Sequence, residues 1–239
     1  HTTELARLIG IDAMDIHGGK AVMLGPKNYL STAHEAAPIG ITVEGANIMT
    51  RSLIIFGQGA FRCQPFVLKE MEAVNLEDEK EAKEQFDIHF FNHIGYTLTN
   101  AASSFVRGMT DKFTDSPVLD ETAIYYRAIN RFSAAFALLT DVSMLVIGGS
   151  LKRKETISAR LGDVLSALYL ASTSLKYYED TGDKESELPL VHWTQKTLLN
   201  DAQEKIDQVL SNFPNKFASL LMRLIIFPLG KNFPEPTVE

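Results

Sequence analysis

The sequence has a single cysteine, Cys63, so no disulfide can form within the chain. A small secreted scaffold held by disulfides is therefore excluded, and one thiol suits a reducing compartment. No block of lysine and arginine stands out, and the formal net charge is -7. A nucleic acid is therefore not an expected partner.

The sequence also lacks an uninterrupted apolar run long enough to span a membrane. The longest run, residues 132–149, is broken by Asp141, whereas a spanning helix needs roughly 20 mostly apolar residues. We therefore predict a buried helix there. No secretory signal is visible. Because His1 stands inside what looks like a helical pattern, we expect the chain to be part of a longer protein.

Apolar residues recur at helical spacing along nearly the whole chain, which predicts an all-α fold built from helical bundles. A first helix should end at Gly18-Gly19, and residues 20–43 should be irregular because of Pro38 and neighbouring glycines. A second helix should begin near Asn47, a residue type that caps helices well.

Further breaks divide the rest of the chain. Pro65 should end or kink the second helix, and Asp115-Ser116-Pro117 marks a boundary between two predicted domains, 1–114 and 115–239. The segment DKESEL before Pro189 is expected to be a polar loop. Helices are expected at about 77–106, 120–147, 154–180, 190–210 and 214–226, and long neighbours joined by a short turn should pack antiparallel.

The segment GITVEGANIMTRSLII, residues 40–55, is the strongest candidate for chemistry. It places Glu44 directly before a glycine and about one turn ahead of a helix start, where free N–H groups can meet a negative group. A carboxylate facing an apolar pocket has a raised pKa and can serve as a general base. Without further information, a plain acidic residue near a helix start is the better interpretation.

A resemblance to a known family changes this balance. The stretch VEGANIMTRSLI resembles the acyl-CoA dehydrogenase segment in which an acid and a glycine precede a helix that carries an arginine. Upstream, DAMDIHGGKAV resembles the family's Gly-Gly stretch at a similar spacing. Residues 12–64 look like the bacterial long-chain branch, and the remainder resembles its extra helical C-terminal region. The implied fold is the end of the catalytic helical bundle followed by a second helical bundle.

The resemblance implies FAD-dependent α,β-dehydrogenation of long-chain fatty acyl-CoA in fatty acid β-oxidation, with Glu44 as the base. It implies that Gly18 and Gly19 lie against the FAD of a neighbouring subunit. The stretch that approaches the flavin would be Gly45, Ala46 and Asn47. The implied partners are an electron-transferring flavoprotein as acceptor and further copies of the chain in a homo-oligomer.

Three departures from the family pattern weaken this assignment of cofactor-binding residues. Asp15 stands where the family usually has glutamine, and its carboxylate would repel a pyrophosphate, so it is carried over only doubtfully. Ala46 lacks the hydroxyl of the usual threonine. An Arg-Asp pair expected near His34 and Glu35 is absent.

Other polar residues have plainer interpretations. His89 and His93 have the spacing of metal ligands on one helix face, but no third ligand is evident, so two partly buried helix residues are expected. His17 should cap a helix end, or lie near the cofactor. Cys63 should be a buried, inert thiol. Arg51 and Arg62 should form salt bridges rather than hold a phosphate.

Two segments leave a rival function open. The basic cluster SLKRK, residues 150–154, is expected to be a solvated helix start, although it could contact CoA phosphates or an anionic membrane. The apolar segment MRLIIFPLG, residues 222–230, should dock on the core, although a membrane surface would also suit it. The rival is therefore a non-catalytic helical scaffold or a membrane-docking module. For either function we expect a cytoplasmic protein, with peripheral contact to the inner face of the membrane left open.

Overall fold

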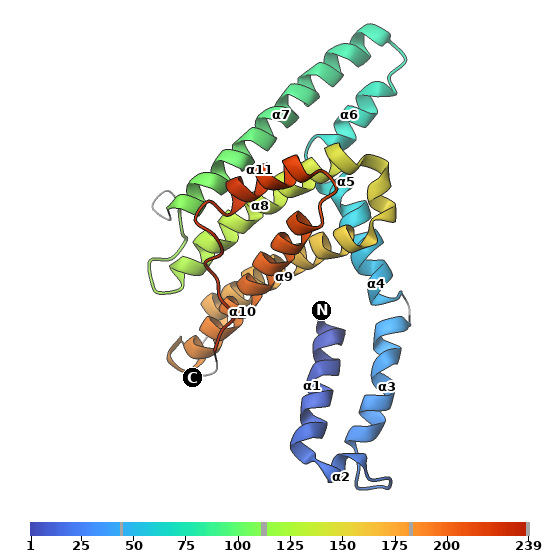
Figure 1. Cartoon of the computed structure of the whole chain (residues 1–239), viewed down its shortest axis with the longest axis vertical. Coiled ribbons are helices and arrows are strands. Elements are labelled where there is room, and N and C mark those ends of the chain that lie inside the picture. Colours follow the sequence, from blue (N-terminus) through green and yellow to red (C-terminus); the bar gives the residue numbers. More distant parts are fainter. Residues whose placement is uncertain (44, 111–113, 182–183, 238–239) are drawn as a thin grey trace. The chain divides into compact units, whose positions relative to one another are not determined.

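The computed structural model describes residues 1–43, 45–110, 114–181 and 184–237. Within these ranges every regular element is a helix and no strand is present, which confirms the all-α prediction. The chain forms two compact units, His1–Arg51 (unit 1) and Ser52–Glu239 (unit 2) (Figure 1). This division lies elsewhere than the predicted domain boundary between residues 114 and 115, which stays a prediction.

Unit 1 is a helical hairpin. Helix α1 (Thr2–His17) ends at Gly18, whose φ of 57° takes the chain out of the helix while its N–H group bonds back to the last turn. Glycine adopts such positive φ angles at little cost, so the predicted stop at Gly18 is confirmed. A short helix α2 (Gly19–Val22) turns the chain toward α3 (Leu30–Thr42), which packs along α1 (Figure 1).

The prediction that residues 20–43 are irregular is wrong, because α3 occupies their second half. The side-chain oxygen of Asn28 accepts hydrogen bonds of 3.1 Å from two backbone N–H groups at the start of α3 and so caps it. Pro38 lies inside the helix. Proline removes one backbone hydrogen bond but leaves the others in place, and contact with α1 supports the helix.

Unit 1 buries very few of its side chains. Among its described residues only Ala21 is fully buried, while many large apolar side chains are exposed. They include Leu5, Leu8, Ile9, Ile16, Met23, Leu24, Ile39, Val43 and Ile48. A helix pair with so much exposed apolar surface is typical of a part that packs against further helices.

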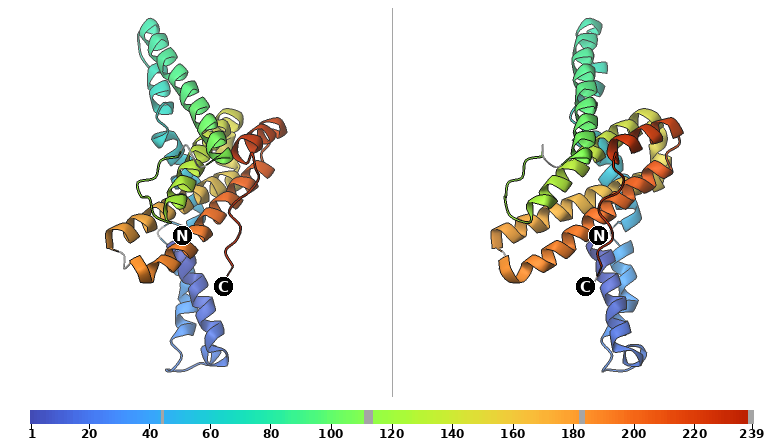
Figure 2. Two further views of the ribbon diagram at one scale, coloured as in Figure 1. Left: turned by 90° about the vertical axis from the view of Figure 1, so that its left-hand side faces the viewer. Right: turned by 60° about the vertical axis from the view of Figure 1, so that its left-hand side comes forward.

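Unit 2 follows a short helix α4 (Asn47–Met49) and contains a larger set of helices. In order these are the π-helix η1 (Thr50–Gln58), α5 (Gly59–Cys63), α6 (Val67–Val74), α7 (Glu79–Met109), α8 (Ala123–Ile147), the 3-10 helix η3 (Gly148–Arg153), α9 (Glu155–Thr181), α10 (Lys184–Ser211) and α11 (Lys216–Ile226). Helices α9 and α10 run antiparallel side by side (Figure 2). The predicted antiparallel packing of long helices is confirmed.

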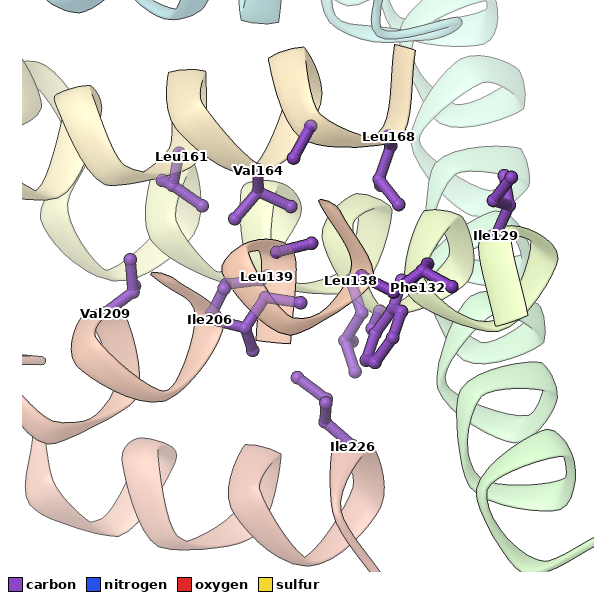
Figure 3. Packing of buried hydrophobic residues seen from close by; sticks show 14 of the residues in the cluster. Ile129, Phe132, Leu138, Leu139, Leu161, Val164, Leu168, Ile206, Val209 and Ile226 are labelled. Carbon is purple, nitrogen blue, oxygen red and sulfur yellow. The ribbon is translucent and has the colours of Figure 1, made fainter. Parts of the chain in front are cut away.

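The core of unit 2 is built around α8. Figure 3 shows Phe132 and Leu139 of α8 facing Leu161 of α9, Ile206 of α10 and Ile226 of α11, and all five are fully buried. The segment 123–151 is long and apolar enough to cross a membrane by length and composition, but half of its most apolar window is buried within the protein. The prediction of a buried helix is therefore confirmed.

Residues 184–188 belong to α10, so the predicted polar loop before Pro189 is wrong. Pro189 lies early in the helix, where it costs one hydrogen bond. Glu185 and Glu187 favour the helix start electrostatically, and Leu188 packs against the core. These contributions stabilise the helix, although the polar composition of the segment predicts a loop.

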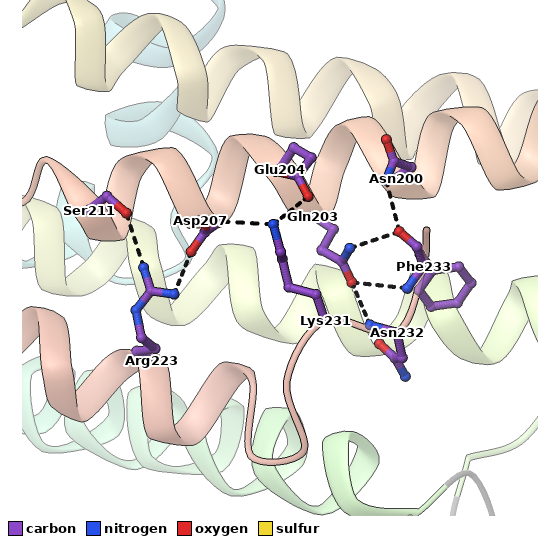
Figure 4. A network of polar contacts seen from close by, with 9 residues as sticks. All are labelled: Asn200, Gln203, Glu204, Asp207, Ser211, Arg223, Lys231, Asn232 and Phe233. Atoms are coloured by element: carbon purple, nitrogen blue, oxygen red, sulfur yellow. Dashed lines mark hydrogen bonds and ion pairs between the residues drawn. The ribbon is translucent and has the colours of Figure 1, made fainter. Parts of the chain in front are cut away.

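The segment after α11 returns along α10 and is held by a polar network (Figure 4). The side-chain oxygen of Gln203 accepts hydrogen bonds from the backbone N–H groups of Asn232 and Phe233, at 2.9 and 3.2 Å. Its nitrogen donates to the Phe233 carbonyl at 2.8 Å. Ion pairs of Asp207 with Arg223 and of Glu204 with Lys231 flank this contact. The nearly fully buried side chain of Gln203 thus holds the segment after α11 by hydrogen bonds to its backbone, in place of regular backbone–backbone pairing.

Candidate functional site

The proposed base, Glu44, lies outside the described residues, between α3 and α4. The residue after it, Gly45, has a φ of 119°, a conformation that glycine adopts and other residues rarely do. A Cβ atom on Gly45 would lie 3.5 Å from the Thr50 hydroxyl, which is an ordinary contact. The glycine is therefore needed for its backbone conformation and not for space.

Asn47 fastens this loop to α1. Its side-chain nitrogen donates to the Thr3 hydroxyl at 2.9 Å and to a Glu4 carboxylate oxygen at 3.1 Å. The expectation that Asn47 caps the helix is wrong, because Ala46 occupies the cap position and Asn47 is the first residue of α4. Both amide hydrogens of Asn47 are directed to α1, so its side chain positions the segment after Glu44.

The second group of predicted residues lies at the corner between α1 and α2. A Cβ atom on either Gly18 or Gly19 would have no heavy atom within 4 Å. Gly18 is required by its positive φ, but nothing in the described chain explains the absence of a side chain at Gly19. This open surface admits the close approach of another group. The Asp15 side chain is exposed nearby.

His17 closes the same end of the hairpin. Its Nδ1 atom lies 2.9 Å from the Ala13 carbonyl oxygen, which can only accept, so Nδ1 carries the proton. In the neutral ring Nε2 then accepts a hydrogen bond from the Tyr29 hydroxyl at 3.0 Å, and the two rings meet edge to face. His17 is thus a link between the end of α1 and the residue before α3.

The two groups of predicted cofactor residues do not come together within one chain. Asn47 contacts the first turn of α1, whereas Gly18 follows its last turn. The 16 residues of α1 separate these two points by about 24 Å at 1.5 Å per residue. The two groups of predicted residues therefore lie at opposite ends of the hairpin, α2 at one end and α4 at the other (Figure 1).

The histidine pair does not form a metal site. His93 Nδ1 lies 2.8 Å from Glu70 of α6, and its Nε2 lies 3.5 Å from Asp141 of α8. No group of three or more acidic, histidine or cysteine residues suited to a metal occurs among the described residues. His93 instead links three helices as a half-buried polar residue, as predicted from the sequence, and its ring stacks on Phe66.

Three other predictions have mixed outcomes. Cys63 is exposed, so the expected buried thiol is wrong; it closes α5, a helix of only five residues that buries none of them. Arg153 and Lys154 are exposed, as expected of a solvated helix start. In the apolar segment 222–230, Met222 and Phe227 are buried, which confirms docking on the core.

Sequence reasoning missed two cavities on the two sides of α5. The first, of about 400 Å³, lies between η1, α5 and α8; most of its lining is apolar, and its polar lining residues include Gln64, Ser133, Thr140 and Asp141. The second, of about 510 Å³, lies between α5, α6 and η3 and includes Arg62. The expected salt bridge of Arg62 is not formed with any described residue. Each cavity combines residues far apart in the sequence, so no local motif indicates it.

Comparison with known families places the larger part of the chain in a family. A family model described as acyl-CoA dehydrogenase, C-terminal, bacterial type, matches residues 61–238, which is more than half of the chain. The match lies within unit 2 and does not include the two groups of predicted residues in unit 1. No solved structure matches the chain.

Proposed function

Because the chain belongs to the bacterial-type acyl-CoA dehydrogenase C-terminal family, we propose that this protein oxidises long-chain fatty acyl-CoA to trans-2-enoyl-CoA in fatty acid β-oxidation. The observation that carries the proposal is the position of Glu44 next to Gly45, whose positive φ sets the loop before α4. The family is one of oxidoreductases that act on acyl-CoA. The base, the cofactor contacts and the chain length are our assignment.

In the proposed reaction, Glu44 removes a proton from the acyl-CoA substrate. Its carboxylate takes the proton from the carbon next to the thioester, and the electron pair of that C–H bond forms the new double bond as a hydride leaves the following carbon. The backbone N–H group of residue 44 donates to the thioester oxygen, and one donor of this kind commonly contributes about 10²–10³ in rate. FAD supplies the acceptor for the hydride.

The residues of unit 1 fit the proposed flavin as two half-sites. Gly18 and Gly19 offer an open surface with no side chain, and Gly45 to Asn47 offer a braced backbone beside the base. Because the two groups lie at opposite ends of one hairpin, they would serve two different flavins. A homo-oligomer in which each chain completes its neighbour's site accounts for this arrangement.

Two residues fit the flavin less well. Asp15 is exposed near the open glycine corner, where its carboxylate would repel a pyrophosphate. Ala46 has no hydroxyl to offer the ring. We therefore assign Asp15 no favourable contact, and assign Ala46 only a backbone contact. An electron-transferring flavoprotein as acceptor and a cytoplasmic location belong to the same proposal.

The second candidate function, a scaffold or membrane-docking module, is favoured by one observation. Four apolar side chains of α11, namely Phe217, Leu220, Leu221 and Leu224, are exposed at helical spacing. Such a stripe suits a partner helix or the surface of a membrane. This function requires neither a flavin nor Glu44, so one experiment separates the two candidates.

The test is the visible spectrum of the full-length protein before and after anaerobic addition of a long-chain acyl-CoA. We expect a flavin band that bleaches in the wild type and persists in Glu44→Gln. Glu84→Gln, an exposed carboxylate on α7, is the matched control and should bleach normally. Equal bleaching in Glu44→Gln would exclude Glu44 as the base, and a protein that stays colourless with added FAD would favour the scaffold.

A further inference from the structure

The cavity around Arg62 in unit 2 has a chemistry of its own. Its volume of about 510 Å³ lies within the range of roughly 300–1,000 Å³ that is usual for small-molecule sites. The residues that line it come from η1, α5, α6, η3 and α9, and all of these lining residues lie in unit 2. The cavity can therefore be described without reference to unit 1.

The walls of the Arg62 cavity are mainly apolar. Leu53 of η1, Leu68 and Met71 of α6, and Leu151 of η3 all line it. Leu53, Leu68 and Met71 each keep at least a third of their surface exposed. Apolar surface left open around a hollow is a surface that a hydrocarbon chain can cover.

Two polar groups in this lining lack partners in the described chain. Arg62 is the one charged residue among the described lining residues, and no hydrogen bond or ion pair holds its guanidinium there. The Ser52 hydroxyl is buried, with 3% of the residue exposed, and has no hydrogen-bond partner. A buried hydroxyl is normally paired, so the Ser52 hydroxyl points to a polar ligand atom, and the exposed guanidinium of Arg62 is free to meet a negatively charged one.

We propose that the Arg62 cavity binds a free single-chain fatty carboxylate, with the carboxylate on Arg62 and the hydrocarbon chain along the apolar wall. The planar guanidinium matches the two oxygens of a carboxylate, and the lining contributes no acidic residue to oppose it. The Ser52 hydroxyl donates a further hydrogen bond to the ligand. The size of the cavity suits one chain better than the two chains of a phospholipid.

The wall also offers a place to block the ligand without disturbing the fold. A Cβ atom on Gly149, which lines the cavity, would have no heavy atom within 4 Å, and its backbone does not have a positive φ. A leucine there enters open space. Gly95 on α7 is equally open and does not line the cavity, so it serves as the matched control.

The test measures binding of dodecanoate to the full-length protein by calorimetry, with dodecanol as the neutral analogue. We expect Arg62→Gln to weaken dodecanoate binding by at least roughly ten-fold through the loss of a charge-assisted contact. Gly149→Leu should weaken dodecanoate and dodecanol alike. The surface control Arg153→Gln and the open-space control Gly95→Leu should bind as the wild type does. Flavin bleaching by acyl-CoA should be unchanged in Arg62→Gln.

Photolabelling with a diazirine-bearing dodecanoate locates the bound chain. We expect labels on the peptides that contain Leu53, Leu68 or Met71, and their loss in Gly149→Leu. Labels confined to other peptides, or equal dodecanoate affinity in Arg62→Gln and Arg153→Gln, would overturn the proposal. So would flotation with anionic phospholipid vesicles that depends on Arg62 while dodecanoate binding does not, because Arg62 would then contact a membrane.

Discussion

The buried side chain of Gln203 fixes the segment after α11 to α10. It makes three hydrogen bonds to the backbone of Asn232 and Phe233, and 1% of its surface is exposed. We expect Gln203→Ala to lower the free energy of unfolding by about 2–4 kcal/mol, because the partner groups lose their bonds. Denaturant unfolding measures this. Gln85→Ala on α7, whose side chain makes no hydrogen bond among the described residues, should cost far less; equal losses would contradict the assignment.

Asp201 gives a pH dependence whose sign follows from its burial. Burial raises the pKa of the Asp201 carboxyl, and the nearby Lys205, 3.8 Å away, offsets only part of this shift. A carboxyl with a raised pKa in the folded state contributes stability that is complete below its unfolded pKa and lost as pH rises through the folded pKa.

We therefore expect Asp201→Asn to raise the Tm slightly at neutral pH. The difference from the wild type should shrink on acidification and vanish below the ordinary pKa of an aspartate. Thermal unfolding followed across this pH range tests the expectation. A variant that is less stable than the wild type at neutral pH would show that the contact with Lys205 outweighs burial.

At the scale of elements, the π-helix η1 sets the shape of the wall between the two cavities. A Cβ atom on Gly57 would lie 3.2 Å from the carbonyl oxygen of Ser52, five residues earlier, which is the hydrogen-bonding spacing of a π-helix. This backbone contact has little room to give. A side chain at Gly57 therefore requires the Ser52 carbonyl to shift by a few tenths of an ångström, although the φ of Gly57 is not positive.

Replacing glycines by alanine in η1 and in α7 should give opposite results. Gly95→Ala on α7 adds a methyl group in open space and should stabilise the protein by about 0.5–1 kcal/mol. Gly57→Ala meets the Ser52 carbonyl and should destabilise it by about 1 kcal/mol. Denaturant midpoints of the two variants provide the measurement. Stabilisation by both would mean that η1 relaxes to an ordinary α-helix.

Helices were predictable where caps and apolar spacing agreed. Asp78 caps α7 with hydrogen bonds to two N–H groups, and α8 begins close to the predicted Asp120, whose side chain bonds to Thr122. The errors lie at Pro38 and Pro189, which stand inside helices that tertiary packing supports. The local sequence shows that a proline removes a backbone hydrogen bond, but it does not show the tertiary contacts that compensate for that loss.

The sequence assigned residues to the candidate site only by resemblance, and it did not predict how they are arranged. Gly18 and Asn47 were assigned to the flavin by resemblance, and the structure places them at opposite ends of one hairpin. The expected irregular segment 20–43 hid this separation, because it is α3, packed along α1, that carries the chain back to the other end of the hairpin. Arg62 was noted without its cavity, since the walls come from segments nearly 100 residues apart.

For the whole molecule, the proposed arrangement of two half-sites per chain predicts that two defective chains can complete each other. Gly19→Leu spoils the glycine corner that one chain offers to its neighbour, and it fits its own chain because no heavy atom lies within 4 Å. Glu44→Gln spoils the base. Each variant alone should be inactive. In an oligomer mixed from both, some sites combine an intact base with an intact glycine corner from the other chain.

After random re-association of equal amounts of the two variants in a dimer, we expect about a quarter of the wild-type rate of acyl-CoA dehydrogenation. The double variant mixed with Glu44→Gln is the control and should give none, because no intact base remains. A Gly19–Glu44 mixture that stays inactive while exchange of subunits is shown by mass spectrometry would place both residues in a site formed by one chain. That result would put residues about 24 Å apart along α1 into the site of one chain, and it would contradict the proposal that each chain completes its neighbour's site.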